Sequence, residues 1–346
     1  MTASEPAKEP LGTALPSSGP PSRAAVVVLG LAVCVAALEL ALHLSQTSMP
    51  SPEGDLARAS AFVRKEVTPK DLIVFSPSWV DPLGRAAFGD LITMERAGWS
   101  DLTRYPRVFE VSLGGKDGSP FKELQTTRRE QFGSIEVRVR ENRGYETIID
   151  DLLPRVAFAP GAPRLDVSRL DVGNHESMCA FRTDRASGGP WDPATPPASY
   201  DCSGGRLGAI ATIDLEYRPR YCIAAEGFGG AHALRLRFRD VRFGKYIAGH
   251  HFGRMVSGAP YGIHTTGEKF NAPPVSAVYS VDEILPGGNG ALRERELGRV
   301  EHRDGESWLP FRVETGPIAG EKGDLIVDLR APGSPNRTYC FEATTR

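Results

Sequence analysis

The sequence has little net charge and few cysteines, and each shortage excludes a class of function. Its 41 Lys and Arg nearly balance 43 Asp and Glu, which leaves a net charge of −2. A strongly basic surface for nucleic acid is therefore not expected. None of the five cysteines belongs to a Cys-x-x-Cys pair, so a zinc ribbon and a thioredoxin-like redox site are disfavoured. A glycine pattern that cradles phosphate is also missing, and no cofactor is implied.

Long apolar runs are scarce, with one exception near the N-terminus. Residues 24–44 read AAVVVLGLAVCVAALELALHL. A helix needs about 20 mostly apolar residues to cross a bilayer, so this run is long enough. Glu39 and His43 lie toward its C-terminal end, where their side chains can reach the membrane interface.

We therefore predict a transmembrane anchor at residues 24–45, preceded by a disordered tail at residues 1–23. Arg23 flanks the run on its N-terminal side, which places the tail in the cytoplasm and the rest of the chain outside it. The expected location is the inner membrane, crossed once. Two alternatives stay open: a cleaved signal peptide, for which no clean small-x-small site follows the run, and a buried soluble helix.

The apolar pattern of the rest of the chain predicts a small α/β unit first. Leu56, Ala59 and Phe62 recur at helical spacing. The runs LIVF at 72–75 and RVFEVSL at 107–113 are typical of strands. We expect this α/β unit to span residues 55–115.

A mainly β region is predicted to follow. Residues 116–210 are expected to be loop-rich with some strands, and residues 211–346 contain many short β-prone runs separated by Gly, Pro and Asn. That pattern is typical of a jelly-roll β-sandwich. The predicted fold is therefore mainly β: a jelly-roll β-sandwich preceded by a small α/β unit and one N-terminal transmembrane helix.

Four cysteines follow the apolar run, and an even number in an exported chain predicts two disulfides. Unpaired buried thiols are the alternative, and four cysteines permit three connectivities. We favour Cys179–Cys202, which closes a loop rich in proline and glycine, and Cys222–Cys340. The second pair depends on the likeness of RYCIAA to TYCFEA, which would be the first and last strands of the jelly roll and neighbours in it.

Two parts of the sequence resemble known families. The segments DLEYRPRYCIAAEG…LRLRFRDVRFGKYIAGHH and ESWLPFRVETGPIAGEKGDLIVDLRAPGSPNRTYCFEATTR are similar to a β-sandwich module of uncharacterised bacterial surface proteins. That module is similar in layout to galactose-binding-like, or carbohydrate-binding-module-like, jelly rolls. The residues that match its pattern are Trp308, Phe311, Thr315, Cys340 and Phe341.

The second resemblance lies in residues 55–113. The segment AFVRKEVTPKDLIVFSPSWVD is similar to soluble extracytoplasmic parts of membrane glycosyltransferases that use polyprenyl-linked sugars. Those enzymes have many membrane segments, whereas a single one is predicted here. The resemblance therefore implies a link to glycans without the membrane machinery that holds a lipid-linked donor.

The segment SPSWVDPLGRAAFGD, residues 76–90, is the first candidate site. Ligands of α/β units bind beyond the C-terminal ends of the strands, which is where this segment is expected to lie. Trp79 offers a face for a sugar ring, and the polar candidates are Asp81, Arg85 and Asp90. An ordinary turn is the alternative, because Asp-Pro-Leu-Gly is typical of turns. No nucleophile with a partnered base is visible, so no catalytic residue is predicted.

Two tyrosines are the other candidate ligand-binding residues. Tyr246 and Tyr261 lie in loop-like sequence, where aromatic rings can stack on a sugar, whereas Trp308 is expected in the core. The neighbouring His250 and His251 should point to opposite faces of a strand, so no metal site is predicted.

These observations predict a membrane-anchored, extracytoplasmic binding or accessory protein of cell-surface glycan assembly that has no catalytic activity. Its expected partner is a glycan or an envelope protein. One alternative is a periplasmic glycan-processing enzyme, either a hydrolase or a glycosyltransferase, that uses residues 79–90. Another is a structural protein of the cell envelope.

Overall fold

The chain divides into two compact units, Met1–Pro52 and Glu53–Arg346. The computed structural model describes residues 23–47, 53–116, 118, 121–157, 165–182, 199–203, 205–213, 219–230, 232–255, 273–284, 292–303, 306–331 and 337–346.

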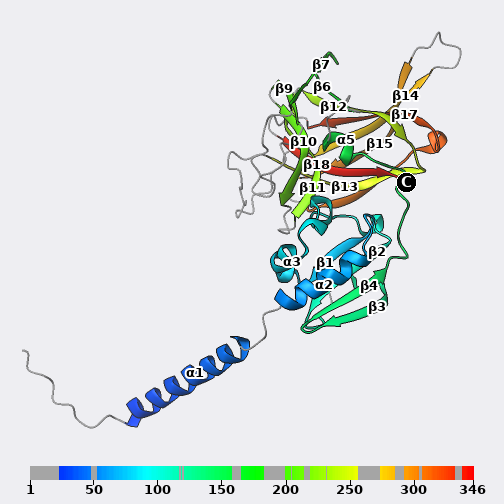
Figure 1. The fold of residues 1–346 in the computed structure, drawn as a ribbon. Coiled ribbons are helices and arrows are strands. Elements are labelled where there is room, and N and C mark those ends of the chain that lie inside the picture. Colours follow the sequence, from blue (N-terminus) through cyan, green and yellow to red (C-terminus); the bar gives the residue numbers. More distant parts are fainter. Residues whose placement is uncertain are drawn as a thin grey trace, which may run out of the picture. The chain divides into compact units, whose positions relative to one another are not determined.

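The first unit contains helix α1 (Arg23–Thr47), which spans the predicted anchor (Figure 1). Its apolar side chains are exposed between residues 26 and 41, as at Leu29 and Leu38. No helix in the described part of the chain combines the length and the apolarity needed to cross a membrane. The run is therefore helical as predicted, but its assignment as a transmembrane segment at residues 24–45 is not supported.

The second unit begins with a four-stranded sheet, which we call the small sheet. Its order is β1 (Leu72–Ser76), β2 (Arg107–Leu113), β4 (Ile135–Glu141) and β3 (Gln125–Phe132). Strands β1 and β2 are parallel, and the other neighbours are antiparallel. The sheet thus includes two strands beyond the predicted 55–115 unit.

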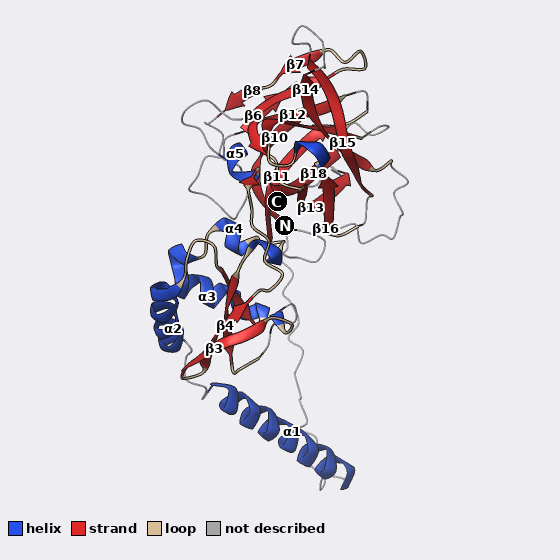
Figure 2. Ribbon diagram, turned by 90° about the vertical axis from the view of Figure 1, so that its right-hand side faces the viewer, coloured by secondary structure: helices blue, strands red, loops and turns tan. Residues whose placement is uncertain are grey.

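Helix α2 (Glu53–Glu66) packs on one face of the small sheet (Figure 2). Leu56, Ala59 and Val63 recur at helical spacing and bury themselves against the apolar side chains of the strands. Short helices follow between β1 and β2, namely η1 (Ser78–Val80), α3 (Asp81–Phe88), η2 (Gly89–Leu91), α4 (Met94–Ala97) and η3 (Leu102–Arg104).

Two larger sheets form a β-sandwich, and one of them has eight strands. Along its path lie β16 (Leu309–Glu314), β13 (Tyr246–Met255), β18 (Arg337–Thr345), β11 (Pro219–Phe228), β10 (Gly205–Ile213), β9 (Ser199–Cys202) and β8 (Ala180–Arg182). The short strand β5 (Asp150–Asp151) pairs with β18 and is followed by α5 (Leu153–Ala157).

The other sheet of the sandwich has six strands. Its order is β15 (Leu292–His302), β14 (Val275–Ile284), β17 (Lys322–Arg330), β12 (Ala233–Arg242), β6 (Leu165–Leu170) and β7 (Glu176–Met178). From β11 to β14 consecutive strands alternate between the two sheets, and the same holds from β15 to β18. The predicted mainly β sandwich is confirmed, and this alternation agrees with a jelly roll.

One large hydrophobic core fills the space between the two sheets. Strand β18 shows how it forms, because alternate side chains of a strand point to opposite faces. Tyr339, Phe341 and Ala343 point into this core and are fully buried. Cys340 and Glu342 therefore lie on the outer face of the eight-stranded sheet.

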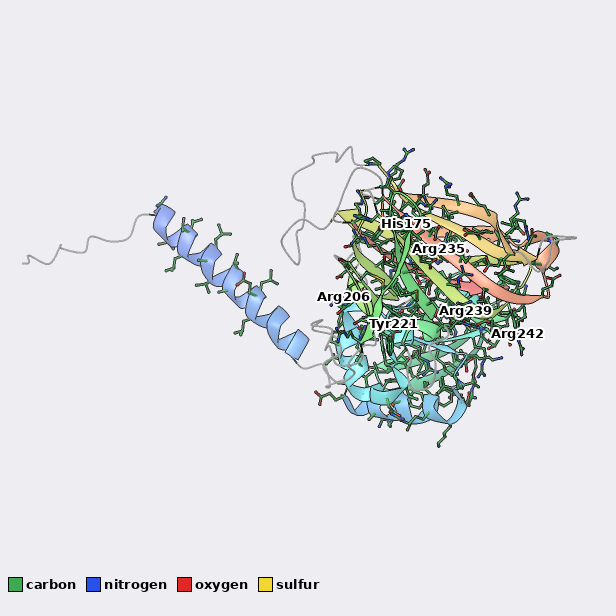
Figure 3. The ribbon with its side chains drawn as sticks, turned by 90° about the horizontal axis from the view of Figure 1, so that it is seen from above. His175, Arg206, Tyr221, Arg235, Arg239 and Arg242 are labelled. Atoms are coloured by element: carbon green, nitrogen blue, oxygen red, sulfur yellow. A yellow bond between two sulfur atoms is a disulfide. The ribbon has the colours of Figure 1, made fainter. Side chains whose placement is uncertain are left out.

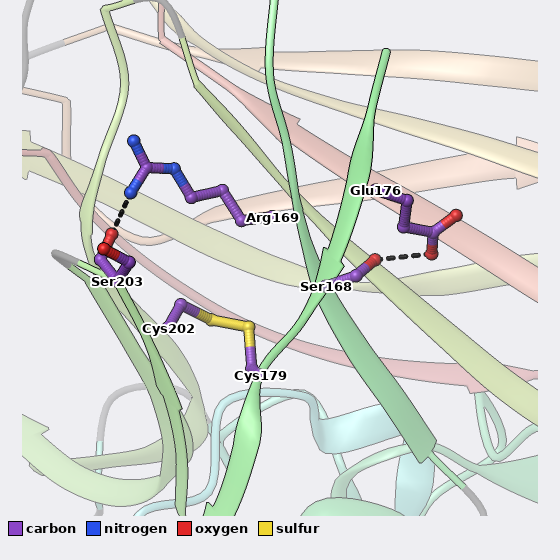
Figure 4. Close-up of a disulfide and its surroundings, with 6 residues drawn as sticks. All are labelled: Ser168, Arg169, Glu176, Cys179, Cys202 and Ser203. Carbon is purple, nitrogen blue, oxygen red and sulfur yellow. Dashed lines mark hydrogen bonds between the residues drawn. A yellow bond between two sulfur atoms is a disulfide. The ribbon is translucent and has the colours of Figure 1, made fainter.

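Both predicted disulfides are present. Cys222 and Cys340 join the neighbouring strands β11 and β18, with their Cα atoms 5.7 Å apart. Cys179 lies between β7 and β8, and its bond to Cys202 is drawn in Figure 4. Since β7 pairs in one sheet and β8 in the other, this second disulfide holds the segment that closes one edge of the sandwich.

The two disulfides should differ in their contribution to stability. Cys222 and Cys340 are 118 residues apart, whereas Cys179 and Cys202 are 23 apart. The chain-entropy model then gives losses of about 5 and about 3 kcal/mol when each bond is removed. Urea unfolding of the Cys222→Ala/Cys340→Ala and Cys179→Ala/Cys202→Ala double variants under oxidising conditions measures both. An equal loss, or a greater one for the shorter loop, would contradict the entropic account.

Candidate functional site

The predicted loop at residues 76–90 is largely helical. It comprises η1, α3 and η2, which directly follow β1. Pro82 lies in the first turn of α3, where its missing N–H removes no hydrogen bond of the helix. The negative charge of Asp81 in the same turn interacts favourably with the positive end of the helix dipole. Glycine is needed at position 84 of the helix because an added Cβ would lie 2.2 Å from the ring of Phe75.

The charged residues of this segment are all engaged in ion pairs. Arg85 Nε donates to Asp81 Oδ2 at 2.5 Å, one helical turn away. Asp90 accepts from Arg64 on α2 at 2.7 Å. The hydrogen bond from Arg64 lowers the pKa of Asp90, so this carboxylate stays ionised. Asp81 and Asp90 are therefore each held by a different arginine.

Trp79 is a predicted site residue that is exposed to solvent. Its side chain is 61% exposed, and Leu83, four residues further along, is 42% exposed. Trp79 lies in η1 and Leu83 lies in α3, the helix that directly follows it. We call these two exposed apolar residues, which follow β1 in the chain, the apolar knob. Asp81 and Arg85 are offset from the knob by two residues and make their own pair.

The two predicted tyrosine sites have different outcomes. Tyr246 does not lie in a loop; it begins β13 and is buried, with the guanidinium carbon of Arg312 3.5 Å from its ring centroid. Burial and the neighbouring Glu146 raise the pKa of its hydroxyl. The structure therefore places Tyr246 in a packed environment. Tyr261 lies outside the described residues.

A buried carboxylate near the ends of the parallel strands was missed by the sequence analysis. Glu110 on β2 is fully buried, although it belongs to an apolar run. Its carboxylate accepts from Ser76 Oγ at 2.8 Å, from the Gly118 N–H at 2.6 Å and from Arg140 Nε at 2.7 Å. These donors converge near the place where α/β folds bind their ligands, and Glu110 itself satisfies them.

A second missed cluster centres on Glu342, on the outer face of the eight-stranded sheet. Its carboxylate accepts from Arg104 at 2.8 Å and from Ser100 Oγ, and His250 Nδ1 lies 3.4 Å away. Burial raises the pKa of Glu342. His250, Arg104 and Ser100 outweigh that effect and lower the pKa to about 2. The group is therefore a permanent anion and not a general acid.

His250 and His251 point to opposite faces of β13, as predicted. His251 lies in the sandwich core, where its Nδ1 is 2.7 Å from the hydroxyl of Tyr339. Burial lowers the pKa of His251 to about 3, so the ring is neutral. Within the described residues, no group of three or more His, Cys, Asp or Glu side chains could hold a metal ion.

The outer face of the six-stranded sheet is covered by paired charges. Arg235 bonds to Asp328 at 2.8 Å, and Arg239 bonds to Asp166 and Asp324. Figure 3 labels the two arginines. The aromatic side chains on the described strands of this sheet, Phe238, Tyr279 and His302, are all buried. The described strands of this face therefore offer no exposed aromatic ring for stacking on a sugar.

Removing Glu110 should destabilise the second unit strongly. The Glu110→Ala variant leaves the buried Arg140 without its main anionic partner, which typically costs about 3–5 kcal/mol. Urea unfolding measures the loss. Glu130→Ala is the control, because Glu130 pairs with the exposed Arg128 and its removal leaves no buried charge unpaired. A loss for Glu110→Ala no larger than that for the control would show that the buried pair is unimportant.

Acid should destabilise the sandwich through His251. The folded-state pKa of about 3 lies below the ordinary 6.5, so the unfolded chain takes up a proton first. Stability is therefore complete above pH 6.5 and falls as the pH decreases, by about 2 kcal/mol at pH 5. The His251→Gln variant should lose this dependence between pH 6.5 and 5, whereas the His232→Gln control should keep it. Urea unfolding at several pH values tests this, and an unchanged slope in His251→Gln would contradict it.

No family model matches the sequence, and no curated protein matches it. Several solved structures show a distant likeness to this chain, and three of them serve as examples. A xylan-binding module from Paenibacillus barcinonensis is 11% identical, with 51% of this chain and 94% of that chain covered and a TM-score of 0.26. A family 61 carbohydrate-binding module in complex with β-1,4-galactotriose is 14% identical, with 37% and 72% covered and a TM-score of 0.22.

The third is a Clostridium thermocellum endo-1,4-β-D-xylanase, of which the family 22 carbohydrate-binding and catalytic modules were solved with xylohexaose. It is 8% identical, with 42% of this chain covered and a TM-score of 0.27. The match spans only 25% of the xylanase chain. Likeness this distant shows neither a family nor a ligand for this protein, so its β-sandwich is defined by its own strands.

Proposed function

We propose that this protein is a non-catalytic, extracytoplasmic glycan-binding protein that serves as an accessory factor in cell-surface glycan assembly at the inner membrane. The apolar knob formed by Trp79 and Leu83 carries the proposal. The two disulfides support an oxidising compartment, since such bonds are rare in proteins of the reducing cytosol.

The chemistry of the knob suits a sugar. At 61% exposure, Trp79 leaves much of a large apolar ring in water, and tryptophan is enriched among the residues that contribute most to binding energy. The face of an indole ring stacks on the C–H face of a pyranose, whose hydroxyl groups remain free to bond elsewhere. Asp81 and Arg85 on α3 are already paired with each other, so the apolar contact at Trp79 carries the recognition.

Binding is favoured over catalysis by the state of the carboxylates. Asp81 and Asp90 are each bonded to an arginine, and Glu110 is enclosed by its donors. Hydrolysis of a glycosidic bond needs two carboxyl groups on either side of one bond, one of them able to give up a proton. The carboxylates of this segment are held as ion pairs, so a recognition role fits them better.

Replacing Trp79 should abolish most glycan binding. We expect the Trp79→Ala variant of the full-length, oxidised protein to lose at least about tenfold in affinity on a glycan array, since burying such a ring contributes about 1.5–3 kcal/mol. Met178→Ala is the matched control, because Met178 is an equally exposed apolar residue on the sandwich. The control should bind as the wild type does.

The other outcomes discriminate between the alternatives. Folded wild-type protein that binds no glycan overturns the proposal, and crosslinking through position 79 in membranes then tests for a protein partner. Release of sugars by the wild type that Asp81→Asn abolishes would instead show an enzyme. Equal losses in Trp79→Ala and Met178→Ala would place the binding surface elsewhere.

A further inference from the structure

The small sheet and the sandwich have separate hydrophobic cores. The apolar clusters around the small sheet draw their residues from the segment 56–139. The clusters of the sandwich begin at Leu152. No apolar cluster of described residues combines side chains from both parts. Hydrophobic burial, which is the usual source of rigid contact between domains, therefore does not join them.

Buried ion pairs make the connection instead. Arg104, from η3 beside the small sheet, donates to Glu342 on β18 and also to Asp151 on β5. Ser100 donates to the same carboxylate. Both partners of the central pair are nearly inaccessible to solvent, with side-chain exposures of 13% for Arg104 and 5% for Glu342. Solvent screening is therefore weak, and each charge depends on the other.

A second set of contacts surrounds Arg346. Its guanidinium donates to Asp101, to Thr103 Oγ and to Glu146, the last at 2.8 Å. Asp101 and Thr103 precede Arg104 in the segment beside the small sheet, whereas Arg346 continues β18. The same two segments are thus joined twice by arginine–carboxylate pairs, once from each side.

The third set involves the backbone. Arg220 on β11 donates to the carbonyl oxygen of Trp99 at 2.8 Å. At Gly98 the two backbones approach so closely that an added Cβ would lie 2.6 Å from the amide nitrogen of Tyr221. Glycine is needed there because any side chain would push the segments apart. Apart from Glu146, the residues that make these polar contacts to the sandwich lie in the short segment 98–104.

We propose that segment 98–104 is a polar lock that fixes the small sheet against the sandwich, and that breaking the lock lets the two parts move separately while each keeps its own fold. The lock would fix the position of the apolar knob relative to the sandwich. The proposal of a lock is independent of which ligand the knob binds. Asn142–Ile149, which connects the two parts along the chain, then serves as the hinge.

The test compares two arginine variants of the full-length protein. Arg104→Met breaks the lock, and Arg235→Met is the matched control. The control pair, Arg235 and Asp328, lies within one sheet, with exposures of 15% and 3% and a contact of 2.8 Å, much like the lock. Calorimetry shows whether unfolding occurs in one step or two, and limited trypsin digestion reports cleavage after Arg143 in the hinge.

We expect Arg104→Met to unfold in two separate steps and to be cleaved at the hinge at least tenfold faster than the wild type. Arg235→Met should lower the unfolding temperature without splitting the transition and without faster cleavage. Arg104→Met/Glu342→Met removes both charges and so avoids stranding a buried carboxylate; it should behave as Arg104→Met does. A single transition in both lock variants, with hinge cleavage no faster than in Arg235→Met, would overturn the proposal.

Discussion

The ion pair between Arg104 and Glu342 is the contact on which the arrangement of the second unit depends. A carboxylate buried to this degree is stable only when several donors surround it. Those donors come from places far apart in the sequence: Ser100 and Arg104 from the segment beside the small sheet, and His250 from β13. Each of these elements must therefore be folded before the charge on Glu342 is compensated.

Because alternate side chains of a strand point to opposite faces, strand β18 contributes to the sandwich core, to a disulfide and to the contact with the small sheet. Tyr339 and Phe341 face inward and fill the sandwich core, whereas Cys340 and Glu342 face outward. The outward residues join β18 to β11 through the disulfide and to the small sheet through the lock. The same alternation on β13 places His250 on the outer face, near Glu342, and His251 on the inner face, near Tyr339. One strand thus couples the core, the covalent link and the contact between the two parts.

The elements that depend on local pattern could be predicted from the sequence. Helix α2, the strands β1 and β2, and the sandwich follow from apolar periodicity. The even number of cysteines predicts two disulfides, with Cys179–Cys202 favoured because it closes a loop rich in proline and glycine, and Cys222–Cys340 favoured because of the likeness of two strands. The helix at residues 81–88 was missed because Pro82 and Gly84 are typical of a turn. Pro82 fits the first turn of a helix equally well, and Gly84 is explained by its contact with Phe75, which no local pattern reveals.

The charged clusters could not be predicted, because their members are far apart in the sequence. Arg104 and Glu342 are 238 residues apart, and Glu110 and Arg140 are 30 apart. The alternation in IEVRVRE places Arg138 and Arg140 on one face of β4, and Glu110 interrupts an apolar run. These are signals that charges are buried, but only the register of β2 against β4 shows that they meet.

The distribution of these charges also explains why the apolar knob is the strongest candidate for recognition. The buried clusters use their polar atoms to hold the protein together, and the outer face of the six-stranded sheet pairs its arginines with neighbouring acids. A ligand at these places would have to displace bonds that already compensate buried or paired charges, which costs free energy. At Trp79 a ligand displaces only water from an apolar ring, so the same contact area yields a net gain.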